Sequence, residues 1–234
     1  MQLFYTQQIT NEAAAFDEAE TTHALQALRL KNGDEIHFTD GNGKLFKGLV
    51  ELVGKKQFIA NKIALIKEEK KTAHQVHLYV SPTKMADRME WLVEKATELG
   101  VASVTPLLTE RTFKKNTNTK RLKNLALSGM KQSLQVFLPI INEPTQLAKI
   151  NFGIAESAFY FGYCGEGEKQ AFGKIEFTAS NIHLFIGPEG DFTAAEIDVL
   201  LQKKCIPVTL GETRLRTETA ALYAIAVLKN KFEN

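Results

Sequence analysis

The chain has 234 residues, of which 44% are hydrophobic and 24% are charged, and its formal net charge is +2. This length allows two compact domains or one large one, and the composition is ordinary for a globular protein in water, which excludes fibrous and disordered classes. There is no apolar run of membrane-spanning length and no signal-peptide pattern at the start, so we expect a cytoplasmic protein without membrane association.

The first part of the chain, to about residue 68, is predicted to be β-rich. Short apolar runs at 35–39, 45–50 and 57–63 are separated by turn sequences at 31–34, 40–43 and 54–56. A short helix capped by Thr21 or Thr22 should run to Leu30. The charged segment 67–71 is interpreted as a linker, which predicts domains at 1–70 and 71–234.

Beyond the linker, strand and helix patterns alternate. Strands are expected at 76–80, 101–108, 158–161, 182–186 and 206–210, and helices at about 85–99, 119–134 and 217–231. This alternation predicts an α/β domain with a mostly parallel sheet and helices on both faces. The last helix is apolar nearly all the way round, so we expect its own domain or a partner subunit to bury it.

A basic band runs from Arg111 to Asn142, with seven Lys or Arg residues and no acidic residue. Such a band is typical of a surface that meets a polyanion, although a solvated helix face would have the same composition.

Two glycine loops near the C-terminus each follow an apolar run and precede a helix. The first is Gly187-Pro-Glu-Gly190, followed by a capping-box pattern at Thr193 and Glu196, and the second begins at Leu210-Gly211. Glycines let the backbone approach a ligand, so two such loops side by side would form a small-molecule cleft, whereas either loop alone could be a structural turn. Neither GxGxxG nor GKS/T is present, which argues against dinucleotide and nucleotide-hydrolase sites.

Together these residues resemble the RsmE family. The resemblance lies in Ile186-Gly-Pro-Glu-Gly190, in Leu210-Gly211 with Leu215-Arg-Thr-Glu-Thr-Ala220, and in the segment 88–100, and it extends over essentially the whole chain. RsmE proteins are 16S ribosomal RNA uridine N3-methyltransferases of the knotted, S-adenosylmethionine-dependent SPOUT superfamily. The resemblance therefore implies an N-terminal PUA-like RNA-binding β-barrel, a C-terminal α/β domain with a trefoil knot, a homodimer, and 16S ribosomal RNA or the small subunit as partner.

The resemblance also implies which residues enclose S-adenosylmethionine (SAM), with no metal required. They come from three strand ends and the last helix: Phe161, Gly162, Ile186, Gly187, Glu189, Gly190, Leu210, Gly211, Leu215 and Thr217. The chain departs from the family pattern at three places. Asp191 replaces a glycine but tolerates the left-handed conformation, Leu122 replaces an aromatic residue, and Lys131 with Gln135 replaces two charged positions, which puts contacts of that helix in doubt.

For the chemistry, Arg216 is the candidate for stabilising a developing imide anion, and Glu218 is the candidate base or orienting group. An Arg216–Glu218 ion pair with a purely structural role is the alternative. The candidate RNA-binding residues are Arg29, Arg111, Lys114, Lys115, Lys120 and Arg121. Two other functions stay open at this point, a ribose 2′-hydroxyl methyltransferase of the same superfamily and a non-catalytic RNA-binding assembly factor.

Overall fold

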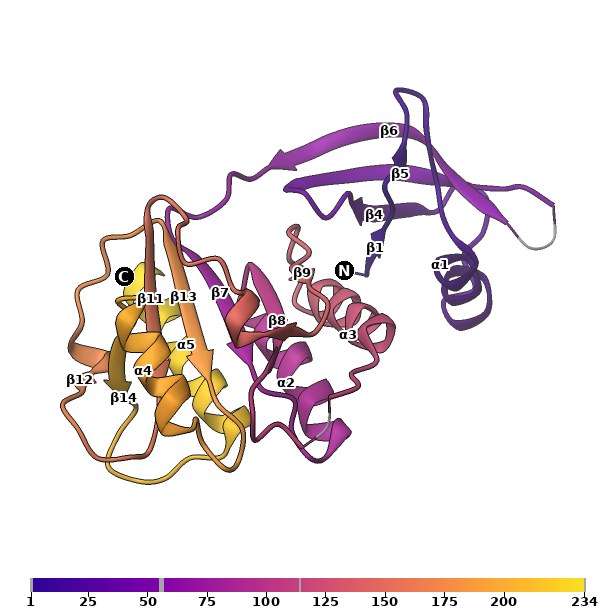
Figure 1. The fold of residues 1–234 in the computed structure, drawn as a ribbon. Coiled ribbons are helices and arrows are strands. Elements are labelled where there is room, and N and C mark those ends of the chain that lie inside the picture. The colour runs from indigo at the N-terminus through magenta and orange to yellow at the C-terminus, as the bar shows by residue number, and fades with distance from the viewer. Residues whose placement is uncertain (1, 55–56, 114, 234) are drawn as a thin grey trace. The chain divides into compact units, whose positions relative to one another are not determined.

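The computed structural model describes residues 2–54, 57–113 and 115–233, which form two compact units (Figure 1). The first unit comprises the chain up to Lys71 together with Met130–Leu138, and the second comprises Thr72–Gly129 and Pro139 onwards. The return of Met130–Leu138 to the first unit was not predicted from the sequence. Since this segment lies 60 residues beyond the charged linker, only tertiary packing reveals it.

A six-stranded sheet forms the first unit, in the order β1-β4-β5-β6-β3-β2. Its strands are β1 (Leu3–Tyr5), β2 (Gln8–Ile9), β3 (Ala13–Ala15), β4 (Glu35–Thr39), β5 (Lys44–Leu52) and β6 (Phe58–Glu68). β1 and β4 are parallel and the other pairs are antiparallel. Phenylalanines fill the core, where the Phe16 and Phe58 rings stack with centroids 4.5 Å apart.

The sequence predicted β4, β5 and β6 but missed the three short strands before them, because each spans only two or three residues. β6 is longer than expected and continues to Glu68, so the first two residues of the predicted linker belong to a strand. In the predicted turn at 54–56, Gly54 has φ +70°, a left-handed value that suits glycine, and Lys55 and Lys56 lie outside the described residues.

The predicted cap of the first helix is wrong. α1 spans Glu18–Thr22, and Asp17 is its N-cap, with a carboxylate oxygen that accepts a hydrogen bond from Glu20 N at 2.8 Å. A π-helical turn, η1 (His23–Ala27), continues it. Thr21 therefore lies inside the helix, since Asp17 already satisfies the free amides of the first turn.

In the second unit all strand pairs are parallel, as predicted. The order is β10-β8-β7-β13-β11-β14-β12, with β9 also paired to β8. The strands are β7 (Gln75–Val80), β8 (Ser103–Leu108), β9 (Ile140–Ile141), β10 (Thr145–Gln146), β11 (Ser157–Gly162), β12 (Gln170–Ala171), β13 (Asn181–Ile186) and β14 (Ile206–Thr209). The sequence missed the two-residue strands β9, β10 and β12.

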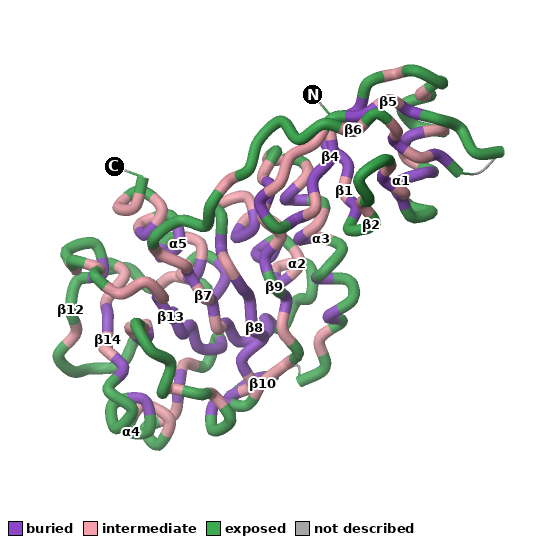
Figure 2. The backbone as a smooth tube through the Cα atoms, turned by 90° about the horizontal axis from the view of Figure 1, so that it is seen from above, coloured by how far each residue is buried: buried purple, intermediate pink, exposed green. Residues whose placement is uncertain are grey.

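Four helices accompany this sheet: α2 (Ala86–Glu98), α3 (Thr119–Gln132), α4 (Ala194–Gln202) and α5 (Thr217–Glu233), with short 3₁₀ turns η2 (Leu147–Lys149) and η3 (Phe172–Lys174). α5 packs on α2, β7 and β13, whereas Leu200 of α4 joins a core cluster with Phe161 and Phe185. Figure 2 shows α4 on one side of the sheet and α5 with α2 on the other. Both faces are therefore covered, and strands such as β13 are buried along nearly their whole length.

α5 is buried on one side rather than all round. Its inner face buries Ala221, Ala224, Ile225 and Leu228, while Tyr223 and Ala226 are exposed. The unit itself thus covers only part of the apolar surface that the sequence predicted to be buried.

Candidate active site at the carboxyl edge of the sheet

The glycine loops begin at one edge of the second unit's sheet. Four adjacent parallel strands end in register there, with Val80 of β7 opposite Ile186 of β13, Ile186 opposite Gly162 of β11, and Gly162 opposite Val208 of β14. Loops at the carboxyl ends of parallel strands are where α/β sheets bind ligands. The prediction that the two loops lie side by side is confirmed, with the end of β11 between them.

Three different segments hold the loop Gly187–Asp191. Thr217 at the start of α5 donates its hydroxyl to Gly187 O at 3.1 Å, and the Lys84 backbone N–H donates to Glu189 Oε1 at 2.9 Å. Arg111 donates from Nη1 to Gly190 O at 2.6 Å. Because these contacts come from α5 and from the segments after β7 and β8, the loop is fixed before any ligand arrives.

Two local predictions about this loop are confirmed. Asp191 has φ +63°, so it takes the left-handed conformation in place of a glycine, and its carboxylate accepts from Cys164 N at 2.7 Å. At the start of α4, Thr193 and Glu196 form both hydrogen bonds of a capping box. The Glu196 carboxylate also accepts from Glu110 N at 2.8 Å, which ties α4 to the segment after β8.

Glycine backbone forms the walls between the loops. A Cβ on Gly162 would lie 3.4 Å from Ile186 Cδ1 and 3.6 Å from Leu210 Cδ1, so these three residues are in contact range of one another. Gly211 has φ +133° and open space where a side chain would be. Phe161 is fully buried in the core cluster, which leaves only its main chain for a ligand at this edge.

Glu218 is a buried carboxylate in the first turn of α5. Its side chain is 9% exposed, and Oε1 lies 3.7 Å from Arg88 Nε of α2. Within the described residues, Oε2 is buried and has no hydrogen-bond partner. A buried oxygen without a partner is costly, so an acceptor of this kind favours a ligand that donates a hydrogen bond.

The ion pair of Glu218 is with Arg88, and not with Arg216 as in the structural alternative considered from the sequence. Arg216 is exposed, and no ion pair of the described chain joins it to Glu218. Sequence reasoning missed Arg88 because it lies 130 residues upstream, although the RsmE-like segment 88–100 begins with it.

The basic band is less uniform than its sequence indicates. Acidic residues from other parts of the chain pair with Arg121 (Glu90, 3.1 Å), Lys123 (Glu143, 3.5 Å) and Lys131 (Glu20). Lys115 and Lys120 are exposed, and over the described ranges no ion pair involves either of them.

Two more of the candidate RNA-binding residues lie elsewhere. Arg29 is exposed in the first unit and has φ +55°, whereas Lys114 lies outside the described residues. Among the members of this group that the structure describes, Arg111 is the one with a hydrogen bond to the glycine loops.

Within 2–54, 57–113 and 115–233, no group of three or more His, Cys, Asp or Glu residues is placed to bind a metal ion. In the same ranges no helix is long and apolar enough to span a membrane. A separate hollow is lined by residues 150–153 and 202–204 and includes none of the loop residues, so we do not connect it with this site.

Two family descriptions match the chain. The model described as "RNA methyltransferase domain" matches residues 69–229, and that described as "RNA methyltransferase PUA domain" matches residues 16–63. The Aquifex aeolicus protein named Ribosomal RNA small subunit methyltransferase E is 28% identical over 98% of this chain and 100% of its own length.

Solved structures agree with this. A "probable rRNA-methyltransferase" from Porphyromonas gingivalis has a TM-score of 0.89 at 29% identity and covers 100% of this chain and 99% of its own. A candidate methyltransferase from Legionella pneumophila, solved with bound SAM, has a TM-score of 0.87 at 26% identity and covers 98% of this chain and 97% of its own. The similarity thus includes both units.

Proposed function

This chain belongs to the RNA methyltransferase family and also carries a match to the RNA methyltransferase PUA domain, and on that premise we propose that it transfers a methyl group from SAM to 16S ribosomal RNA. The carrying observation is the pair of glycine loops that meet at the carboxyl edge of the sheet beside a buried, half-satisfied carboxylate. The names of the relatives and the SAM-bound structure at 26% identity support the same substrates.

The SAM site in this proposal uses the backbone around Gly162, Ile186 to Gly190, and Leu210 with Gly211. The fit rests on the open space at Gly211 and on the close approach of Gly162 to its two apolar neighbours, where a larger residue would fill the cleft. Leu215 is half-buried, and Thr217 contributes through its bond to Gly187 O. When bound, SAM supplies an electrophilic methyl group on its sulfonium.

We place the reaction at N3 of a specific uridine. Uracil N3 carries a proton and lies on the Watson–Crick edge, so the base must be unpaired before it can react. Glu218 is the proposed acceptor of this proton: Arg88 faces Oε1 at 3.7 Å, and Oε2 is left for the imide N–H. Arg88 is thereby a positioning residue in this proposal.

Arg216 is proposed to stabilise the imide anion through the uracil carbonyl oxygens. Its exposure supports this role, as does the fact that the ion pair of Glu218 in the described chain is with Arg88, because a guanidinium engaged in a structural pair would not be available to the substrate. An Arg216→Ala protein that binds SAM normally and keeps full turnover would contradict this assignment.

The first unit and the exposed cations are proposed to bind RNA. Arg29 would contribute from the PUA-like unit, and Arg111, Lys114, Lys115, Lys120 and Arg121 from the second. We also propose the trefoil knot and the homodimer of the family, the latter supported by the exposed Tyr223 and Ala226 on an otherwise apolar α5. A ribosomal substrate would place the activity in the cytoplasm.

The test is mass-spectrometric mapping of methyl groups in 16S RNA from cells that lack this protein, before and after treatment with the purified protein and SAM. We expect one uridine N3-methyl mark to be missing and then restored. Loss of a ribose 2′-O-methyl mark instead would reassign the target, and unchanged methylation would favour a non-catalytic assembly factor.

A further inference from the structure

Phe113 is an aromatic side chain in an unusual position. It follows β8 by five residues and is 72% exposed, more than any other large hydrophobic side chain of the described chain. Exposing a phenylalanine to this extent gives up most of the free energy that its burial would supply. It also lies within the sequence of the basic band, between Arg111 and Lys115. A ligand that combines negative charge with a flat apolar face would therefore suit it.

The turn that carries Phe113 is rigidly anchored. Thr112 is buried, and its hydroxyl lies 2.8 Å from Ser81 Oγ, at the end of β7, while also accepting from Thr109 N at 2.8 Å. The residue before it, Arg111, donates to Gly190 O in the first glycine loop. Phe113 thus directly follows two residues that are tied to β7 and to the first glycine loop, which places it next to the proposed active site and reduces the entropy lost when a ligand stacks on it.

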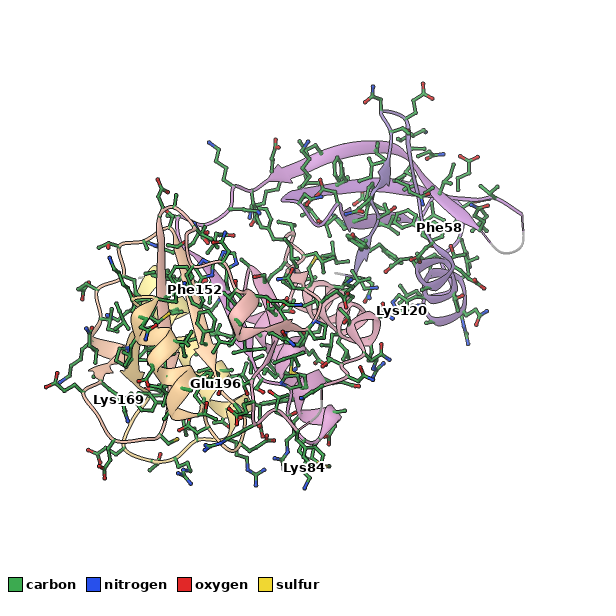
Figure 3. The ribbon with its side chains drawn as sticks, in the orientation of Figure 1. Phe58, Lys84, Lys120, Phe152, Lys169 and Glu196 are labelled. Carbon is green, nitrogen blue, oxygen red and sulfur yellow. The ribbon has the colours of Figure 1, made fainter. Side chains whose placement is uncertain are left out.

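A cation covers one face of the Phe113 ring. Lys84 Nζ lies 5.1 Å from the ring centroid, a cation–π contact, and the Lys84 backbone amide donates to Glu189 Oε1. Figure 3 shows the Lys84 side chain at the outer edge of the second unit, close to the start of α2. The Glu189 carboxylate accepts from this neutral amide and keeps its own negative charge, so the group at this point that can meet a phosphate is the Lys84 ammonium on the ring.

An exposed ring beside lysine and arginine is the combination with which proteins bind single-stranded nucleic acid, because every base has a face that can stack and every nucleotide has a phosphate. When a uridine is turned out of the stack for methylation, the base next to it loses a stacking partner. An aromatic platform beside the active site would replace that partner.

We propose that Phe113 stacks on an unpaired nucleotide adjacent to the methylated base, with Lys84 fixing the ring and meeting the neighbouring phosphate. This inference rests on the proposed RNA substrate and adds to it a chain-specific contact that holds the strand in register with the cofactor loops. The occupant is a nucleotide rather than a protein side chain, because the ring is flanked by Lys84, Arg111 and Lys115.

The chain allows a direct optical test because Trp91 is its single tryptophan. In a Trp91→Phe/Phe113→Trp protein, stacking on a base should quench the fluorescence as single-stranded oligouridylate is added. Anisotropy of a labelled oligouridylate would report binding separately. Saturated binding with unchanged tryptophan emission would overturn the proposal.

Affinity and its salt dependence separate stacking from charge. Phe113→Leu should raise the Kd for oligouridylate about 5- to 150-fold without changing the slope of log Kd against log salt. Lys84→Met should instead lower that slope by about 0.7. Ile154→Ala, which truncates another exposed apolar side chain of the same unit, is the matched control and should leave the Kd unchanged.

SAM binding and methyl transfer, measured on the same proteins, distinguish this inference from the proposed function. Quenching without any methyl transfer would overturn the function and leave the platform. Transfer and RNA affinity that are both unaffected by Phe113→Leu would overturn the platform and leave the function. An effect of Phe113→Leu that is seen only with assembled small subunits would assign the ring to a ribosomal protein and so also overturn the proposal.

Discussion

In the part of the chain that the structure describes, each unit contains a buried glutamate that forms an ion pair with one basic side chain. Glu20 in the first unit is 3% exposed and pairs with Lys131, and Glu218 in the second is 9% exposed and pairs with Arg88. In both, among the described residues, one carboxylate oxygen is buried without a hydrogen bond. By residue type, burial and partner charge the two sites are nearly the same.

Their surroundings differ. Lys131 forms a direct charge-assisted hydrogen bond with Glu20, and burial raises the pKa of that carboxyl above its ordinary value. Arg88 Nε lies 3.7 Å from Glu218 Oε1, which is too far for a strong hydrogen bond. Thr217, the residue before Glu218, donates a hydrogen bond to the glycine loop. A tight pair of this kind fits a structural role, whereas a loose pair next to a residue that is bonded to the glycine loop keeps an acceptor for a ligand, so the contacts of the two glutamates distinguish their roles.

The comparison is tested most strongly by Glu218→Gln. If Oε2 takes the imide proton, the glutamine side-chain amide of the variant cannot take it, and kcat should fall about 10²- to 10⁴-fold. The affinity for SAM, measured by calorimetry, should stay within about twofold. Glu20→Gln is the matched control and should keep kcat. Equal turnover in the two variants would make Glu218 a structural residue like Glu20.

Lys131→Met should have the next largest effect, on stability. Removing the partner leaves Glu20 buried and uncompensated, and we expect the free energy of unfolding to fall by about 2–3 kcal/mol, less than for a fully enclosed pair because Lys131 is 21% exposed. Denaturant titration would measure it. The Glu20→Gln/Lys131→Met double variant should recover most of the loss.

Lys123→Met, on the same helix, is the control for charge removal. Its pair with Glu143 is 55% and 72% exposed, so the cost should stay below about 1 kcal/mol. A similar loss for Lys123→Met and Lys131→Met would show that helix charge rather than burial matters.

The sequence predicted the backbone of the site better than its side chains. The glycine loops, the capping box and the left-handed Asp191 depend on residues close in sequence, so local rules were sufficient. Whether a basic side chain is paired depends on acidic residues far away in the sequence: Glu20, the partner of Lys131, lies 111 residues from it. The lysine at position 131, where the family pattern has a different charge, is therefore explained by its ion pair with Glu20, which no local sequence pattern reveals.

Arg88 and Phe113 were missed for related reasons. The pairing of Arg88 with Glu218 joins α2 to α5, and only the packed fold brings them together. Phe113 is an ordinary residue in the sequence: it lies between the strand predicted at 101–108 and the helix predicted at 119–134, and a phenylalanine is expected to be buried. Its exposure is a property of the anchored turn, and it becomes informative only once the turn is seen.

The smallest expected effect is a pH dependence that distinguishes Glu20 from the rest of the molecule. Burial, the largest cause, raises its pKa in the folded state above the ordinary 4.5, so the folded state binds this proton more tightly than the unfolded state does. The stability due to protonation is therefore fully present below pH 4.5 and is lost as the pH rises through the folded pKa.

His183 acts in the opposite direction, since burial and, secondarily, His77 lower its pKa from 6.5 to about 4 and the folded protein loses stability as the pH falls through that range. The effects of Glu20 and His183 overlap in the wild-type protein, so the measurement must compare two proteins that differ only at Glu20. We expect the unfolding free energy of the wild type minus that of Glu20→Gln to increase as the pH falls toward 4.5, because His183 cancels between the two proteins. A difference that is flat with pH would mean that the pKa of Glu20 is not raised by folding, and a difference that decreases as the pH falls would mean that Lys131 holds Glu20 ionised in the folded state.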